Sequence, residues 1–81
     1  MYTENEIELL ENLVSELEKE TINISNIESI VGDLRSITKN TNIMKYIVDD
    51  IDISLEYRTT LNIDSLRSEI YYILDSNEEV A

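Results

Sequence analysis

The sequence contains no cysteine and no histidine, and these two absences exclude much chemistry. Without cysteine there is no disulfide and no thiolate to act as a nucleophile or metal ligand. Without histidine, the commonest zinc ligand and the usual acid–base group at neutral pH are both missing. No glycine-rich phosphate loop is present either. We therefore expect a protein that is not an enzyme and that holds no metal and no cofactor.

The chain also lacks proline, phenylalanine and tryptophan, and it has a single glycine. Nothing marks a linker or a second domain, and β-hairpins lack their usual turn residues. Eighty-one residues suffice for one domain near the lower limit of what a single core stabilises alone. Self-association is one common way to add buried area at this size. We expect one acidic helical domain over residues 1–81, with residues 77–81 frayed.

Long apolar runs are absent as well, and none approaches the roughly 18 residues of a membrane span. The N-terminal stretch MYTENEIELL is acidic, whereas a signal peptide is basic at this position. Isoleucine and asparagine are frequent while alanine occurs only at Ala81, a bias that suits AT-rich coding sequences of low-GC bacteria and their phages. We expect a cytoplasmic protein of a bacterial host cell that makes no membrane contact.

Positive charge is scarce. The sequence has 18 acidic residues and only six basic ones, which gives a net charge of −12. Such a chain repels nucleic acid and anionic membranes and favours basic protein partners. The alternative is that the acidic residues only keep a small protein soluble. Seven glutamates and one lysine fall within residues 1–20, so the first predicted helix is the most acidic element.

The first helix is predicted to start at Thr3, which forms a capping box with Glu6. Apolar residues recur at helical spacing and predict its buried face: Ile7, Leu10, Leu13, Val14 and Leu17. At about 100° per residue, four glutamates share the opposite face. They are Glu4, Glu8, Glu11 and Glu18.

The second helix is predicted to start with a capping box of Ser25 and Glu28 and to end at Lys39 and Asn40, a cation and a residue that tolerates the left-handed conformation. Its predicted buried face comprises Ile27, Ile30, Val31, Leu34 and Ile37. A stripe of small residues lies away from that face, namely Ser29, Gly32 and Ser36. This stripe either permits a close helix contact or lies in open solvent.

The last helix is predicted to begin near Asn62 or Asp64 and to end at Asp75-Ser76-Asn77. Its inner face would contain Ile63, Leu66, Ile70, Ile73 and Leu74.

Residues 46–58 fit two secondary structures. Ile51, Ile53, Leu55 and Tyr57 alternate with polar residues as in a half-buried strand, but no hairpin turn or partner strand accompanies them. The same region gives a coherent helical face of Met44, Ile47, Val48, Ile51 and Leu55, and we favour a helix that ends near residues 57–58. The fold class is then all-α, a small four-helix bundle or a three-helix one, with homodimerisation as a means of completing the core.

The helical interpretation leaves this third helix with a second apolar face. Tyr46, Ile53 and Tyr57 lie at about 180–220° from the core-facing side. Asp49, Asp50 and Glu56 border them. A helix that is apolar on both sides is normally sandwiched or at an interface, and tyrosine is favoured at interfaces. Another part of the same chain could also cover this face.

The segment Asp50-x-Asp52-x-Ser54-x-Glu56 resembles the opening of a calcium loop. Leu55 replaces the glycine needed at the sixth position, and Leu61 replaces the bidentate glutamate at the twelfth. We therefore reject an EF-hand.

Two functions remain. In the first, the protein is an inhibitor of the DNA-mimic type, such as a phage anti-defence protein, an antitoxin or an immunity protein. Its carboxylate-rich helical face would bind a basic, nucleic-acid-binding protein, with no direct contact to nucleic acid. The predicted partner-binding residues are Glu4, Glu8, Glu11, Glu18, Tyr46, Asp49, Asp50, Ile53, Glu56 and Tyr57. In the second, the protein is a structural or adaptor subunit that self-associates through the outer face of the third helix.

Overall fold

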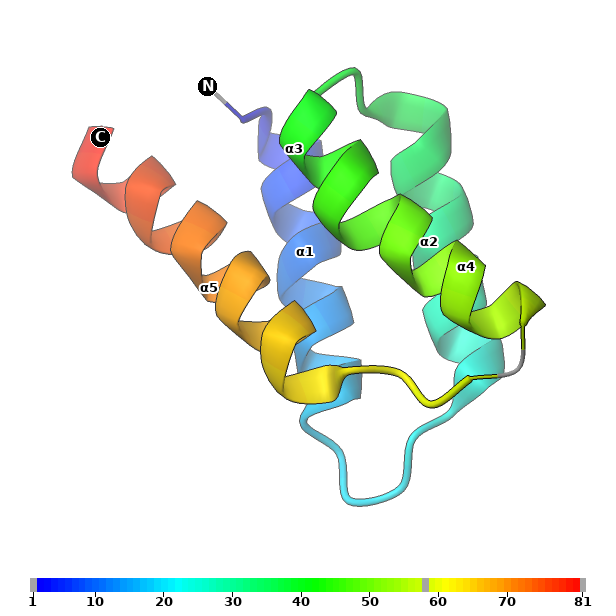
Figure 1. Ribbon diagram of the computed structural model, residues 1–81. Helices are drawn as coiled ribbons and strands as arrows, with labels where there is room; N and C mark the ends of the chain where they lie inside the picture. Colours follow the sequence, from blue (N-terminus) through cyan, green and yellow to red (C-terminus); the bar gives the residue numbers. More distant parts are fainter. Residues whose placement is uncertain (1, 58, 81) are drawn as a thin grey trace.

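The computed structural model describes residues 2–57 and 59–80, and the side chains of residues 2–57 and 59–76. Over these residues the chain forms four helices and no strand, which confirms the predicted all-α bundle (Figure 1). They are α1 (Glu4–Leu17), α2 (Ile24–Ile37), a continuous helix composed of α3 (Thr41–Ile43), the π-helical segment η1 (Met44–Val48) and α4 (Asp49–Glu56), and α5 (Ile63–Val80). The strand interpretation of residues 50–58 is therefore wrong for the described part of that stretch.

The start of α1 agrees with the prediction. The Thr3 side chain accepts a hydrogen bond from the Glu6 amide at 3.2 Å, and Glu6 Oε1 accepts one from the Thr3 amide at 2.8 Å. This capping box satisfies two amides that a helix end leaves without partners. Of the five predicted core residues of α1, four are buried and Ile7 is partly exposed.

Both ends of α2 differ from the prediction. Asn23, not Ser25, caps the helix, because its side chain accepts a hydrogen bond from the Asn26 amide at 3.2 Å. At the other end Ile37 is 44 % exposed while Thr38 is buried, since the chain leaves the helix there in an extended conformation. Asn40 is not left-handed. It is extended, and its side chain caps α3.

The third helix confirms the predicted core face and adds one feature. Within η1 the turn is wider than in an α-helix, and the Asp49 amide bonds to the Met44 carbonyl five residues back. Ile47, Val48 and Ile51 are fully buried, as is Ile43, which the prediction missed. The helix ends at Glu56, close to the predicted end, and Arg58 lies outside the described residues.

The last helix starts where one of the two predicted caps places it. The Asn62 side chain accepts a hydrogen bond from the Ser65 amide at 3.2 Å, whereas the Asp64 side chain lies in solvent. The predicted stop at residues 75–77 is wrong, because α5 continues to Val80. Fraying was predicted for residues 77–81. Ala81 and the side chains of residues 77–80 lie outside the described part of the structure, so the fraying stays a prediction.

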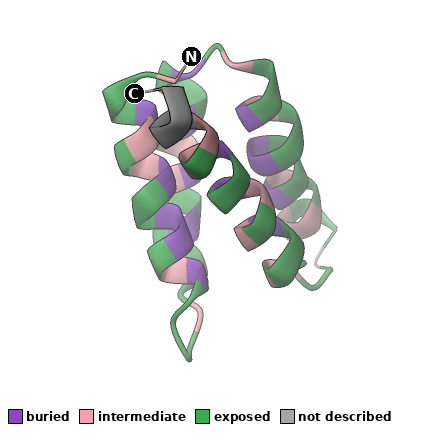
Figure 2. Ribbon diagram, turned by 90° about the vertical axis from the view of Figure 1, so that its left-hand side faces the viewer, coloured by how far each residue is buried: buried purple, intermediate pink, exposed green. Residues whose placement is uncertain are grey.

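The helices form a ring around one apolar core. α1 packs against α2 and α5, and η1 packs against the same two helices. The helix over residues 41–56 therefore lies diagonally across the core from α1. Figure 2 shows the α1–α2 pair and the 41–56 helix on opposite sides, with buried residues facing inward and exposed ones outward. The fully buried side chains are Leu10, Leu13, Ile27, Val31, Leu34, Ile43, Ile47, Val48, Ile51, Leu66 and Ile70.

Gly32 lies on the solvent side of α2, and a Cβ atom added there would meet no other atom within 4 Å. Within the described residues, therefore, no close helix contact requires a glycine at this position. The other interpretation, that the stripe lies in open solvent, fits Gly32. We expect Gly32→Ala to stabilise the fold by about 0.5–1 kcal/mol, because alanine costs less backbone entropy than glycine in a helix. Urea denaturation of both proteins measures the difference, and a loss of stability would contradict the expectation.

Candidate protein-binding surfaces

Six of the ten predicted binding residues form one face of the helix over residues 41–56 and its C-cap Tyr57, which we call the outer surface. Its large side chains are well exposed: Tyr46 at 47 %, Ile53 at 55 % and Tyr57 at 69 %. Asp49, Asp50 and Glu56 are also exposed and complete the set. The outer surface thus combines apolar area with negative charge, as predicted from the helical spacing.

The outer surface is rigidly supported from beneath. On the opposite side of the same helix, Ile47, Val48 and Ile51 are fully buried. An ion pair between Arg35 and Asp52 ties α4 to α2. Tyr46 is additionally covered on one ring face by Lys45, whose Nζ lies 5.5 Å from the ring centroid. A partner would therefore meet a preformed surface, which lowers the entropy lost on binding.

The acidic face of α1 is only partly as predicted. Glu4, Glu8 and Glu11 are exposed, and none of them forms an ion pair with a described residue. Glu18 instead turns toward α5. Its Oε2 accepts a hydrogen bond from the Tyr71 hydroxyl at 2.9 Å and lies 3.3 Å from an Arg67 nitrogen. The bond to the Glu18 carboxylate raises the pKa of Tyr71.

These two faces point away from each other because their helices lie diagonally across the core (Figure 2). The structure brings together Tyr46, Asp49, Asp50, Ile53, Glu56 and Tyr57, but it does not bring the α1 glutamates to them. A partner with a flat surface can contact only one of the two faces. The four predicted α1 residues and the six residues of the outer surface are therefore separate candidate sites.

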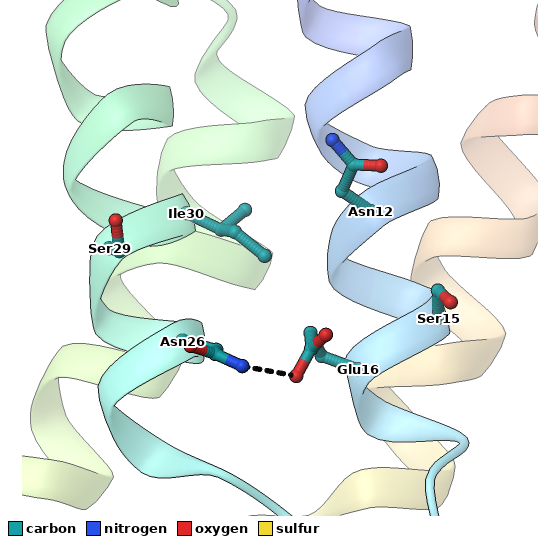
Figure 3. Close-up of a pocket in the computed structure, with 6 residues that line it drawn as sticks. All are labelled: Asn12, Ser15, Glu16, Asn26, Ser29 and Ile30. Atoms are coloured by element: carbon teal, nitrogen blue, oxygen red, sulfur yellow. Dashed lines mark hydrogen bonds between the residues drawn. The ribbon is translucent and has the colours of Figure 1, made fainter.

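A further surface, missed in the sequence, is the α1–α2 groove, which contains two pockets of about 300 Å³ each. The first pocket is lined by Asn12, Ser15, Glu16, Asn26, Ser29 and Ile30. Figure 3 shows these side chains on two facing helices, with a hydrogen bond of 3.1 Å from the Asn26 amide group to Glu16 across the seam. The second pocket is lined by Asn5, Glu8, Leu9, Asp33, Ser36 and Ile37. The signal for this groove was the recurrence of short polar residues at seven-residue intervals.

The first pocket is electrically balanced and the second is not. Lys19 Nζ lies 2.6 Å from Glu16 Oε2, and the hydrogen bond from Lys19 lowers the pKa of Glu16, with a further contribution from Asn26. The second pocket holds the carboxylates of Glu8 and Asp33, and the described residues that line it include no lysine or arginine. At this end of the groove two carboxylates line the pocket, and the nearby Lys39 lines an adjoining pocket that also contains Ile37.

Glu6 and Thr38 form a buried polar link whose partners the sequence did not reveal. Glu6 is only 4 % exposed and Thr38 only 7 %. The Thr38 hydroxyl donates to Glu6 Oε2, and Thr38 Oγ1 accepts from the Asn40 amide at 3.1 Å. The link joins the first turn of α1 to the end of α2. It is buried and structural, so it belongs to neither binding surface.

Comparisons with known proteins found no match to a family model, to a curated protein or to a solved structure. Among the described residues, no group of three or more acidic side chains is placed to hold a metal ion. No described helix is long and apolar enough to cross a membrane. The exposed surfaces of the molecule are therefore the features that bear on its function.

Proposed function

We propose that the protein is a non-enzymatic, cytoplasmic inhibitor that binds a basic, nucleic-acid-binding protein through the outer surface. The observation that carries the proposal is the exposure of Tyr46, Ile53 and Tyr57 on one side of a helix whose other side carries fully buried side chains. Three large apolar side chains at helical spacing make a patch of the kind used in protein interfaces. By occupying the partner's basic surface, the protein would exclude nucleic acid from it.

Charge supports a basic partner over a neutral one. Asp49, Asp50 and Glu56 border the apolar patch and outnumber Lys45, which lies over the Tyr46 ring, and the whole chain carries a net charge of −12. Acidic residues at the rim of an apolar patch favour a partner rich in lysine and arginine and speed its association. The α1 glutamates face the other way, so their contribution to this complex is long-range attraction rather than contact. Proteins that bind nucleic acid present such basic surfaces.

The same charges weigh against the alternative function, self-association of a structural or adaptor subunit through the outer surface. In a two-fold symmetric dimer the same patch meets itself. Asp49, Asp50 and Glu56 of both copies would then lie in one interface, and like charges across an interface are unfavourable. Because Ile53 is exposed, it could also pack against a second copy of the chain, and the experiment below therefore includes a test for a dimer.

Replacement of Ile53 by Asp tests the proposal. We expect Ile53→Asp to weaken capture of the basic partner at least about tenfold, because it adds charge to the centre of the apolar patch. The measurement is affinity capture from a bacterial lysate at low and high salt, followed by titration of the captured protein. Binding should fall with rising salt, and added DNA should compete for the partner.

The matched control is Ile24→Asp, which introduces the same change on α2, where Ile24 is 39 % exposed at the start of the helix. A carboxylate is tolerated at a helix N-terminus, so this variant should bind as the parent does. Equal loss in both variants would show that added charge alone weakens binding. If sedimentation instead reveals a parent dimer that Ile53→Asp dissociates, the protein is the self-associating subunit.

A further inference from the structure

We propose that the α1–α2 groove docks a cationic amphipathic helix of a partner protein, independently of the outer surface. The lining residues of the two pockets correspond one to one at a spacing of seven. On α1, Asn5, Glu8 and Leu9 correspond to Asn12, Ser15 and Glu16. On α2, Asn26, Ser29 and Ile30 correspond to Asp33, Ser36 and Ile37. The groove is thus a repeated pocket two helical turns long.

This spacing selects a helix as the occupant. Seven residues of an α-helix rise about 10.5 Å, so the two pockets lie about that far apart along the groove. A helix laid along the groove presents side chains seven residues apart at the same spacing on one face, as in coiled coils. A β-strand does not fit, because residues on one face recur every second position, at about 6.6 Å and then about 13 Å.

The pocket lining sets the chemistry of that helix. Leu9, Ile30 and Ile37 supply apolar area at the groove, and Ile37 is 44 % exposed. The second pocket holds Glu8 and Asp33, so it favours a lysine or arginine. The first pocket has its carboxylate neutralised by Lys19, so it favours an uncharged side chain seven residues away. The expected motif is therefore a cation and an uncharged residue at i and i+7.

A second copy of this chain is a poor occupant. α1 contains no lysine or arginine, and Arg35 of α2 is paired with Asp52. Two copies joined through this groove would bring Glu4, Glu8, Glu11 and Asp33 near their equivalents. The helix that fits must come from a protein with the opposite charge.

The test uses a 21-residue alanine-based helical peptide that carries three Lys–Leu pairs, in each of which the leucine lies seven residues after the lysine. A peptide of the same composition in which each leucine lies five residues after its lysine is the spacing control. We expect the first peptide to shift backbone amide resonances of residues 5–16 and 26–37 in a titration followed by NMR. The control peptide should bind at least tenfold more weakly, because its side chains cannot fill both pockets at once.

Two charge reversals on α2 localise the site. Asp33→Lys places a cation in the second pocket and should weaken binding of the seven-spaced peptide at least tenfold. Glu28→Lys makes the same charge change at an exposed position outside the groove and should weaken it less than about twofold. Equal weakening by both variants, or equal binding of both peptides, would overturn the proposal because only net charge would then matter.

The outer surface provides a separate readout. Ile53→Asp should leave peptide binding unchanged, because Ile53 lies on the other side of the bundle. If the peptide instead shifts residues 46, 53 and 57, it binds the outer surface, and the inference about the groove is wrong while the proposed function stands. If the peptide binds the groove but Ile53→Asp has no effect on partner capture, the proposed function fails alone.

Discussion

Ile47→Ala is expected to remove about 2–5 kcal/mol from the free energy of unfolding. Ile47 is fully buried in η1, the segment that packs against both α2 and α5. Truncation would leave a cavity where three helices meet, and none of them can move inward without losing its other contacts. An 81-residue domain has a total stability of only about 4–12 kcal/mol, at about 0.05–0.15 kcal/mol per residue. The variant should therefore be largely unfolded in mild urea.

Two substitutions make this expectation specific. Ile47→Val removes a single methyl group from the same site and should cost about 0.5–1.5 kcal/mol. Ile53→Ala truncates an isoleucine on the opposite side of the same helix, where it is 55 % exposed, and should change stability by less than about 0.5 kcal/mol. Urea denaturation followed by far-ultraviolet circular dichroism measures all three. Similar values for Ile47→Ala and Ile53→Ala would contradict the inward orientation of Ile47.

Glu6→Ala should have the second largest effect, a loss of about 2–3 kcal/mol. The Glu6 carboxylate accepts hydrogen bonds from the Thr3 amide and the Thr38 hydroxyl. Its removal would break one of the two capping-box bonds of α1 and leave the Thr38 hydroxyl buried without its acceptor. Glu4→Ala is the control, because Glu4 lies in the same turn but is exposed. A loss of the same size in both variants would indicate that only the charge near the helix N-terminus matters.

The Glu6 carboxyl should also make stability depend on pH. Burial by itself raises the pKa of Glu6, but hydrogen bonds from the Thr3 amide and the Thr38 hydroxyl outweigh it, so the pKa lies below its ordinary value of 4.5. A carboxyl whose pKa is lower in the folded state stabilises the fold above its unfolded pKa. That contribution is lost as the pH falls through the folded pKa.

We therefore expect the stability difference between the parent and Glu6→Gln to be largest near neutral pH and to shrink below about pH 4.5. Denaturation of both proteins at each pH measures it. Because both carry the other acidic residues, repulsion among those residues largely cancels in the difference. A difference that is constant between pH 7 and pH 3 would show that ionisation of Glu6 does not contribute.

Helical periodicity predicted the four helices because each one buries a single apolar stripe. The helix ends were harder, since several residues near each end can act as caps. Ser25 and Glu28 satisfy the capping-box pattern, yet Asn23 caps α2 two residues earlier. The burial of Thr38 could not be predicted locally, because it depends on Glu6, 32 residues away. The wider turn of η1 likewise carries no sequence mark that we recognise.

The outer surface was predictable from one helix alone. Once the buried face of that helix is identified from its apolar spacing, the residues on its opposite face follow. The separation of this surface from the α1 glutamates was not, since periodicity shows which side of a helix is inward but not which helices are neighbours. Glu18 shows the same limit. Its partners Arg67 and Tyr71 follow it by 49 and 53 residues. The α1–α2 groove required the pairing of two helices as well as the seven-residue recurrence in each.

The closed ring of helices also affects the order in which contacts form during folding, because closing a longer loop of chain costs more entropy. The bond between Glu16 and Asn26 closes a loop of only 10 residues, whereas the bond between Glu18 and Tyr71 closes one of 53. Loop-closure entropy makes the longer closure more costly by about 1.5 kcal/mol. We therefore expect the α1–α2 pair to form from local contacts and α5 to pack against it afterwards. Thermal opening should begin by release of α5 from α1, leaving the α1–α2 groove as the most persistent part of the molecule.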